Sequence, residues 1–495
     1  MDDRTTAAVS RELKRELRLL DATMIVIGSM IGSGIFIVSA DIARTVGSPG
    51  YLLLVWIITG AMTLIGALSY GELAGMMPRA GGQYVYLREA YNPLIGFLYG
   101  WTLFMVIQTG TIAAVAVAFA KFTAVLFPGL GEATVLLAVG PLKITPAQCV
   151  AVGSVALLTA VNTRGIQIGK LLQDGFTFAK TGALFGLIVL GFILGRNATA
   201  VDVNFSNFWN AAWTHLEGGK IVSVEVLSGI GLLAAISVAM VGSLFSSDAW
   251  NNITFMAGEV INPRRNLPLS LAIGTGAVTL LYIMANIAYL LMLPLVGNPA
   301  SGDVLGRGIQ FAVSDRVGTA ATTVMFGDGG TTIMAVLILA STFGCNNGLI
   351  LAGARVYYAM AKDGVFFAVA GLLNRRNVPG IALVFQGVWA SLLCLSGTYG
   401  ELLDYVMFAV LVFYILTMGG IFVLRRKQPD ADRPYKAVGY PLLPGVYMLA
   451  AAGICVSLLV LKPLYTWTGV GIVLTGIPVF YIWRSALPLF RGRSR

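Results

Sequence analysis

Long apolar runs occupy most of the 495 residues and exclude most folds. A run of about 20 apolar residues is long enough to cross the hydrocarbon core of a bilayer as a helix. Only 11% of the residues are charged, against about 25% in soluble proteins, so a soluble globular enzyme is excluded. Twelve runs are candidate spans: 22–46, 51–76, 94–124, 147–163, 173–195, 227–257, 269–294, 331–360, 380–397, 402–424, 441–461 and 467–484.

These runs do not alternate between apolar and polar residues, as strands of a membrane barrel would. Each span must satisfy its own backbone hydrogen bonds inside the bilayer, and a single segment can do so only as a helix. The sequence therefore predicts an all-α polytopic membrane protein with 12 transmembrane helices.

The positive charges indicate the orientation. If the N-terminus is cytoplasmic, most of the 33 Lys and Arg residues fall on the cytoplasmic side, as the positive-inside rule requires. We therefore expect both termini in the cytoplasm of a multi-pass cell-membrane protein, and the compact loops favour a prokaryotic inner membrane. The net charge of +10 then faces anionic membrane lipid and needs no nucleic-acid partner.

Few residues are available for metal or catalytic chemistry. The only histidine, His215, lies in a polar stretch that reads as a loop, and the four cysteines lie in apolar stretches without zinc or disulfide spacing. We expect no metal and no cofactor. An enzyme would need paired acids, or a nucleophile with a base, inside the bilayer, and the spans lack these parts, so we do not expect an enzyme.

Two spans contain residues that interrupt a helix. In the first span, residues 28–34 hold three glycines and two serines, and each Gly costs ~1 kcal/mol relative to Ala in a helix interior. This segment either unwinds or packs closely through its GxxxG pattern. In the sixth span, Ser246, Ser247 and Asp248 are good helix N-caps. One half-helix is expected to end near Phe245 and another to begin near Ala249, with Asp248 capping it, facing a ligand, or both.

Other polar residues lie inside spans. Lys180 in the fifth span either snorkels to the headgroups, or acts as an internal cation on backbone carbonyls or as a proton carrier. Asn346 and Asn347 in the eighth span need hydrogen-bond partners and either join helices or contact a ligand. Gln108 belongs to a weaker polar patch in the third span.

The interrupted spans are the first and the sixth, which is the pattern of a transporter built from two inverted five-span repeats. Half-helix N-termini meeting near the midplane suit a carboxylate, and unwound carbonyls suit an ammonium group, so the expected ligand is a zwitterion such as an amino acid. The predicted divisions are a cytoplasmic segment 1–20, repeats 21–195 and 226–424, two additional helices in 441–484, and a cytoplasmic tail 485–495.

Ordered motifs carry a resemblance to a known family. They include Gly32-Ser33-Gly34-Ile35-Phe36, Ala80-Gly81-Gly82-Gln83-Tyr84-Val85-Tyr86, Ala179-Lys180, Trp250-Asn251, Glu259 through Asn262-Pro263, Asn347-Gly348 and Arg433-Pro434-Tyr435-Lys436. From about Leu19 to Leu461 the chain resembles the amino acid–polyamine–organocation superfamily and, within it, the L-type amino acid transporters. The resemblance implies a leucine-transporter-like fold of 5 + 5 inverted spans with two additional helices.

The resemblance also implies a binding mode. N–H groups around Ser33 and Gly34 would bind the substrate carboxylate, carbonyls near Met30, Ile31 and Phe245 would meet its amino group, and Phe245 would be an aromatic gate. Lys180 would replace the sodium ion of related transporters, and the absence of cysteine from 125–146 implies no disulfide-linked heavy subunit. The predicted substrate-binding residues are Met30, Ile31, Gly32, Ser33, Gly34, Gln108, Phe245, Ser246, Ser247, Asp248 and Asn251.

The predicted function is therefore secondary transport of L-amino acids by alternating access, through sodium-independent exchange or proton-linked uptake. Asp248 leaves open a proton-coupled carrier of cationic amino acids or polyamines, because some relatives that accept basic substrates carry an acid at this position. An amino-acid-binding membrane sensor is a further alternative of a different class.

Overall fold

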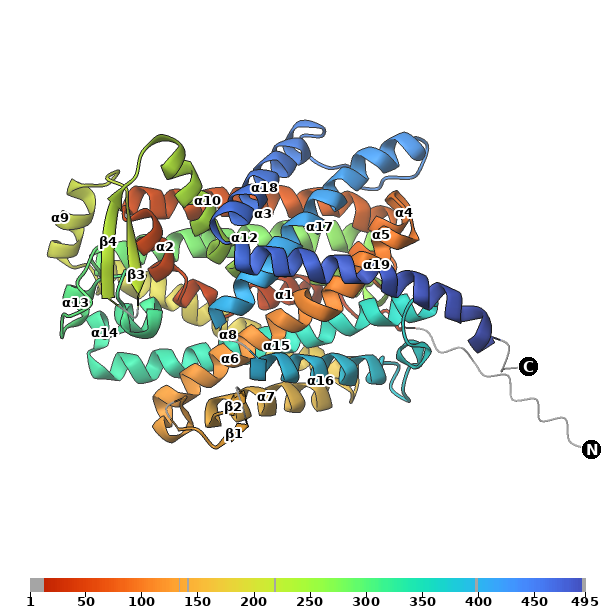
Figure 1. Ribbon diagram of the computed structural model, residues 1–495, viewed down its shortest axis with the longest axis horizontal. Helices are drawn as coiled ribbons and strands as arrows, with labels where there is room; N and C mark the ends of the chain where they lie inside the picture. Colours follow the sequence, from red (N-terminus) through yellow and green to blue (C-terminus); the bar gives the residue numbers. More distant parts are fainter. Residues whose placement is uncertain (1–12, 133, 140–141, 218–219, 397–398, 492–495) are drawn as a thin grey trace, which may run out of the picture.

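The predicted apolar runs fold as long helices that lie mostly along one axis of the molecule (Figure 1). The computed structural model describes residues 13–132, 134–139, 142–217, 220–396 and 399–491. Of the predicted terminal segments, 1–12 and 492–495 lie outside the described residues. Among the described residues, nine helices are long and apolar enough to cross a membrane, and shorter apolar helices (α1, α7 and α16) coincide with the other three predicted runs. An all-α polytopic architecture is confirmed.

The elements follow the predicted order. The first half contains α1 (Leu19–Met30), η1 (Gly34–Phe36), α2 (Ser39–Val46), α3 (Pro49–Met76), α4 (Gln83–Ala90), α5 (Pro93–Thr102), η2 (Leu103–Ile107), α6 (Gln108–Leu126), η3 (Pro128–Leu130), β1 (Leu137–Val139), β2 (Leu142–Ile144), α7 (Pro146–Asn162) and α8 (Ile166–Ile193). A connecting segment then holds α9 (Ala198–Ser206), β3 (Ala212–Glu217) and β4 (Lys220–Val226).

The second half begins with α10 (Gly229–Ser246), α11 (Asn252–Phe255), η4 (Ala257–Glu259) and α12 (Pro263–Met292). It continues with α13 (Val304–Arg307), η5 (Val313–Asp315), α14 (Val317–Phe326), α15 (Asp328–Lys362), η6 (Ala368–Gly371), α16 (Gly380–Ser396), α17 (Tyr399–Lys427), α18 (Leu442–Leu461) and α19 (Pro463–Arg491). Helix α19 thus runs on through residues 485–491, which the sequence assigned to the tail. The division into two inverted repeats at 21–195 and 226–424 stays a prediction.

The polar stretch around His215 is not a simple loop. It forms the antiparallel hairpin β3–β4, in which Ala212 pairs with Val226 and Glu217 with Lys220. Strand β3 packs on α2, where a Cβ on Gly47 would lie 2.3 Å from the carbonyl oxygen of Ala212. The hairpin therefore covers α2, the second half of the first span.

Two groups of helices make up the core of the bundle. In one group, α12 packs along α3 and α1, and α10 packs on α3. In the other, α6 packs against α15, α7 and α16. Helix α8 contacts both groups, because it packs against α1, α12 and α15. It is therefore placed to respond to any shift of one group against the other.

The segment that leads into α1 and the last turns of α19 lie at the same end of the bundle, here called the terminal end (Figure 1). Here the N–H groups of Glu16 and Leu17 donate to the Glu259 carbonyl at 2.8 and 2.9 Å. The Glu259 carboxylate accepts two hydrogen bonds from Arg355 at 3.0 and 3.1 Å, and the two side chains are 2% and 0% exposed. These contacts join the N-terminal segment, the sixth span and α15.

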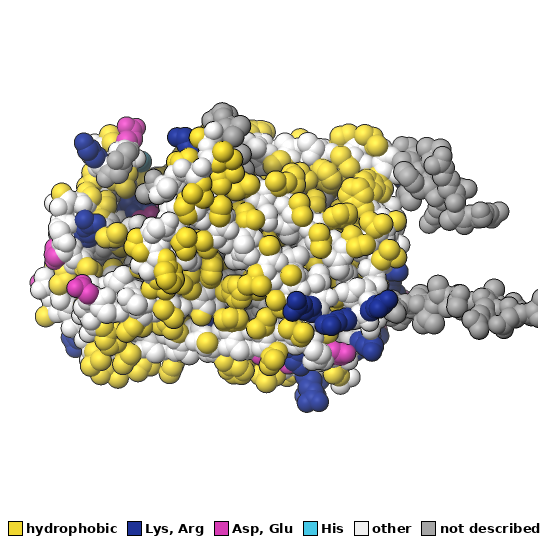
Figure 2. Space-filling model, turned by 90° about the horizontal axis from the view of Figure 1, so that it is seen from below, with side chains coloured by type: hydrophobic (Ala, Val, Ile, Leu, Met, Phe, Trp, Pro, Cys, Tyr) yellow, Lys and Arg dark blue, Asp and Glu magenta, His cyan; other side chains and the backbone are white. Residues whose placement is uncertain are grey.

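The sides of the bundle are apolar. Figure 2 shows apolar side chains over most of the visible face, with a group of Lys and Arg toward the terminal end. Leu171, Ile230 and Leu449 are 73%, 86% and 77% exposed, which is costly in water and favourable in lipid. This distribution is that of a protein surrounded by a bilayer.

Candidate functional site

The first span is interrupted where its glycines predicted. Helix α1 ends at Met30, Ile31 is extended with φ −76° and ψ 98°, and the chain resumes as the 3-10 turn η1 before α2. Close packing occurs in the same segment, because a Cβ on Gly28 would lie 2.0 Å from Nε2 of Gln173. The two interpretations of the glycines therefore both hold.

Five consecutive carbonyls, of residues 28–32, accept hydrogen bonds from side chains of other helices. The last carbonyls of α1 and those of the unwound residues after it need such donors in a membrane, because water is not present to supply them. The bonds are Lys180 Nζ to the carbonyls of Gly28 and Ile31 (2.6 Å for Ile31), Cys345 Sγ to Ser29 (3.1 Å), Tyr282 OH to Met30 (3.0 Å) and Ser341 Oγ to Gly32 (2.9 Å). The donors come from α8, α12 and α15, so three helices hold the break open.

Lys180 lies inside the bundle and not at its surface. Its side chain is buried, at 1% exposure. Besides its two bonds to the first span, its ammonium group lies 3.4 Å from the carbonyl of Ser341. A buried cation needs such oxygen partners. The lysine therefore fixes the unwound segment to α8 and α15.

The sixth span is interrupted as well, and the break is longer than expected. Helix α10 ends at Ser246, and α11 begins at Asn252 with Asn251 as its N-cap. The predicted start near Ala249 is wrong, because Ala249 has φ +66°, a left-handed conformation that stops a helix. Because Asn251 is the N-cap of α11, Asp248 does not cap this helix. Its carboxylate accepts a hydrogen bond from Tyr414 of α17 at 2.5 Å.

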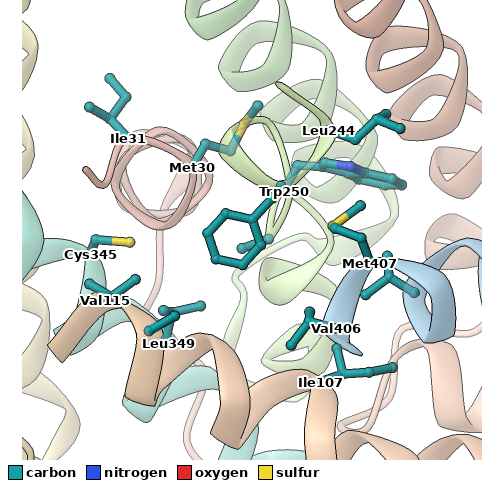
Figure 3. Packing of buried hydrophobic residues seen from close by; sticks show 14 of the residues in the cluster. Met30, Ile31, Ile107, Val115, Leu244, Trp250, Cys345, Leu349, Val406 and Met407 are labelled. Carbon is teal, nitrogen blue, oxygen red and sulfur yellow. The ribbon is translucent and has the colours of Figure 1, made fainter. Parts of the chain in front are cut away.

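The two breaks lie against each other. A Cβ on Gly34 would be 2.0 Å from Oγ of Ser246, so only a glycine fits here without displacing the serine. The Tyr282 hydroxyl lies 3.0 Å from the Met30 carbonyl and 3.1 Å from the Ser246 carbonyl, which joins the ends of α1 and α10. Figure 3 shows the Met30 side chain pointing from α1 toward the segment that carries Leu244 and Trp250.

A small, narrow pocket adjoins the second break. Amides, hydroxyls and one carboxylate share the wall with apolar side chains. The lining residues are Gln83, Tyr99, Leu103, Ile107, Gln108, Thr111, Asp248, Ala249, Asn251, Asn252, Phe255, Leu349, Val410 and Tyr414.

Three predicted substrate-binding residues line this pocket, namely Gln108, Asp248 and Asn251. The others lie in or beside the two breaks rather than in the pocket wall, and the side chains of the non-glycine residues among them are buried. They are Met30, Ile31, Gly32, Ser33, Gly34, Phe245, Ser246 and Ser247. The pocket therefore extends from the second break toward α6 and α17.

Of the two amides of the eighth span, Asn347 holds helices together. Asn347 Nδ2 donates to the carbonyl of Gly169 at 3.0 Å and to Oε1 of Gln173 at 3.1 Å, and its Oδ1 accepts from Asn162 at 2.9 Å. These bonds join α15 to α7 and α8. Asn346 is also buried, at 2% exposure, and neither amide lines the pocket.

Sequence reasoning did not identify several residues of this site. Tyr282, Ser341 and Tyr414 each contact a break. The two tyrosines lie in apolar runs without a local pattern that marks them, and Ser341 directly precedes the polar stretch of the eighth span. Cys345 lies in an apolar stretch that gives it no role, and its thiol contacts the Ser29 carbonyl. Within the described ranges, no group of three or more His, Cys, Asp or Glu side chains is arranged to hold a metal ion.

We expect Gly34→Ala to destabilise the fold by about 1–3 kcal/mol, the usual cost of overpacking. The added methyl group would collide with Ser246, whose Cβ and Cα would be 2.8 and 3.1 Å away. The double variant Gly34→Ala/Ser246→Gly should recover part of the loss. Thermal unfolding in detergent measures both effects.

Gly182→Ala is the matched control, because a Cβ at Gly182 meets no atom within 4 Å. It should leave the unfolding temperature unchanged or raise it slightly, since Ala favours a helix. Equal stability of Gly34→Ala and the unmodified protein would contradict the close contact of the two breaks.

Comparisons with known proteins agree with this architecture. The amino acid permease family matches residues 17–484. The chain is 30% identical to the human large neutral amino acids transporter small subunit 2 over 95% of this chain and 80% of the relative, and 31% identical to the rat protein over 95% and 81%. It is 29% identical to the rabbit b(0,+)-type amino acid transporter 1 over 86% and 79%. The chain therefore belongs to the amino acid permease family, within the amino acid–polyamine–organocation superfamily.

Proposed function

We propose that the protein is a secondary transporter that moves L-amino acids across a cell membrane by alternating access. The observation that carries this proposal is the meeting of two interrupted helices beside a pocket of mixed polarity. Discontinuous helices at matching positions are the usual site of substrate binding in such transporters. Membership of a permease family and the names of the relatives support the same substrate class.

The breaks suit both ends of a zwitterion. N–H groups around Ser33 and Gly34 would bind the carboxylate, and the carbonyls of Met30, Ile31 and Phe245 would face the ammonium group. The Met30 carbonyl already accepts a bond from Tyr282, and the Ile31 carbonyl accepts bonds from Lys180 and Ser341. A carbonyl oxygen has two lone pairs, so the Met30 carbonyl can also accept a bond from the substrate.

Lys180 supports sodium-independent transport. Its ammonium group binds backbone carbonyls of the first span and lies near one of the eighth, where a sodium ion lies in sodium-driven transporters of this fold. A fixed positive charge would repel a second cation at this place. We therefore propose exchange, with proton-linked uptake as the other mode.

The charge pattern supports an orientation with the terminal end in the cytoplasm, as in a prokaryotic inner membrane. Lys and Arg gather toward the terminal end on the face that Figure 2 shows, as the positive-inside rule requires. We also propose that the chain works without a disulfide-linked heavy subunit, because residues 125–146 contain no cysteine. Amino acid and membrane lipid are then its partners, and no enzymatic activity is proposed.

Counterflow in proteoliposomes tests the function. Vesicles loaded with unlabelled L-amino acids should transiently accumulate an external labelled L-amino acid several-fold above equilibrium. Replacing sodium by choline should leave the accumulation unchanged, because Lys180 takes the place of the ion. The measurement is the internal label over time.

Protein-free vesicles and D-amino acids are the controls for this experiment. Binding of label without accumulation would contradict transport and favour a membrane sensor. Accumulation that requires sodium would contradict the proposed role of Lys180 while leaving transport itself intact.

We expect Lys180→Ala to reduce counterflow by about 100-fold while the protein stays folded. Hydrogen bonds to a charged group contribute about 1.5–3 kcal/mol each, and this variant removes two of them from the first break. Lys143→Ala, in an exposed position of β2, is the matched control and should transport normally. Unchanged counterflow in Lys180→Ala would show that the cation has no part in transport.

A second candidate is a carrier of cationic amino acids or polyamines. Asp248 supports it, because it is the acid of the pocket lining and is 9% exposed there. Tyr414 holds one carboxylate oxygen at 2.5 Å, and a carboxylate can accept several further bonds. An ammonium group on a substrate side chain would therefore find a fixed negative partner.

If this second candidate is correct, Asp248→Asn should weaken competition by basic amino acids by about tenfold, a change that corresponds to about 1.4 kcal/mol. Competition by neutral amino acids should stay within a factor of about two. A panel of the twenty amino acids against one labelled substrate measures both.

Asp303→Asn, on an exposed outer loop, is the matched control and should leave the panel unchanged. Equal losses for neutral and basic competitors in Asp248→Asn would contradict the second candidate, because the carboxylate would then serve the amino group that all substrates share.

A further inference from the structure

The segment Gly81-Gly82-Gln83 belongs to a sequence motif that the proposed binding mode does not use. It forms the start of α4, between α11 and α15. Gly82 has φ +43°, and a Cβ there would lie 2.4 Å from Oγ1 of Thr254. The N–H of Gly81 donates to the Phe255 carbonyl at 3.0 Å. The glycines thus let the chain pass directly against the second half of the sixth span.

This close approach brings the carboxamide of Gln83 into the wall of the pocket. The side chain is 1% exposed. Its Oε1 accepts a hydrogen bond from Asn251 at 3.0 Å, and its Nε2 donates to the Phe413 carbonyl at 3.2 Å and to Oγ1 of Thr417 at 3.0 Å. One amide therefore joins the break of the sixth span to α17.

The pocket side of α17 has a second link to the same break, the bond from Tyr414 to Asp248. The ion pair of Glu259 and Arg355 lies farther toward the terminal end and joins the sixth span to α15 rather than to α17. Gln83 is therefore placed between the pocket and the terminal end. The sixth span cannot separate from α17 unless this carboxamide loses either Asn251 or both of its partners on α17.

We propose that Gln83 is the positioning residue that closes the cytoplasmic side of the pocket, by holding Asn251 of the sixth span against α17. The proposal rests on the proposed transport function and on the cytoplasmic assignment of the terminal end. During release to the cytoplasm the Gln83 carboxamide exchanges either Asn251 or its two partners on α17 for water. When the pocket is closed, the carboxamide keeps all of these partners, and the substrate side chain contacts it at the cytoplasmic wall of the pocket.

Thiol labelling tests this gate without any amino acid. Asn252 lines the pocket, and its Nδ2 has no hydrogen-bond partner, so Asn252→Cys removes no bond from that amide nitrogen. In this variant the four native cysteines are replaced by serine. A membrane-impermeant sulfonated thiol reagent is applied to the cytoplasmic face in inverted vesicles and to the outer face in spheroplasts.

We expect Gln83→Leu to raise the labelling rate from the cytoplasmic face about tenfold, a factor that corresponds to about 1.4 kcal/mol, with no increase from the outer face. Gln83→Glu should give a smaller rise, because it keeps the acceptor for Asn251 and loses the donor to α17. Thr417→Val is a milder variant that removes only one of the three hydrogen bonds of Gln83, together with the bond of the Thr417 hydroxyl to the Phe413 carbonyl within α17. It should also raise cytoplasmic labelling.

Gln386→Leu is the matched control. Gln386 is a buried glutamine whose Nε2 donates to Ile350 at 3.1 Å, and it does not line the pocket, so its loss should leave both labelling rates unchanged. Equal labelling in Gln83→Leu and its parent, or an equal rise from both faces, would overturn the proposal. If Gln83→Leu does not fold, Thr417→Val decides by the same criterion. Absence of counterflow would instead overturn the transport function. The labelling rates can still be measured and interpreted in that case, because they require no amino acid.

Discussion

The fold depends on side chains that donate hydrogen bonds to the backbone carbonyls at the break of the first span, because no water is present inside a membrane. Each unsatisfied carbonyl costs several kcal/mol in hydrocarbon, and residues 28–32 present five of them. Side chains from α8, α12 and α15 supply the donors. The helices of both packing groups are thus held to one short segment, and the same segment lies against the second break. The same hydrogen bonds therefore stabilise the fold and maintain the proposed binding site. If the break closed into a regular helix, these carbonyls would bond within the helix and the surrounding polar side chains would lose their partners.

The polar residues of the spans divide into two kinds. The hydrogen bonds of Lys180 and Asn347 all go to backbone or side-chain groups of neighbouring helices. These two residues therefore maintain the arrangement of the bundle. Asp248 and Gln108 also have partners, Tyr414 and the Leu349 carbonyl, yet both line the pocket. A carboxylate and an amide that are already oriented lose little freedom when a ligand binds. The pocket therefore presents fixed polar groups to its substrate.

The sequence predicts the helical architecture well, because hydropathy reports directly on membrane spans. It also places both interruptions, since glycines and polar residues in mid-span weaken a helix by local chemistry alone. It cannot place Tyr282 or Tyr414, whose role depends on which helices become neighbours. The start of α11 was missed because the left-handed Ala249 has no sequence pattern, and the β3–β4 hairpin was missed because its short strands resemble a polar connection.

The third span contains a wide π-helical turn, Leu103–Ile107, immediately before Gln108. Such a turn inserts one extra residue into the winding and rotates everything on one side of it by about 100° relative to a regular α-helix. Tyr99 on one side and Thr111 on the other both reach the pocket, although twelve positions separate them. Deleting one residue here would restore regular winding and turn one half of the pocket-facing stripe toward another helix. The extra residue of the π-helical turn thus determines which side chains of the third span face the pocket on either side of it.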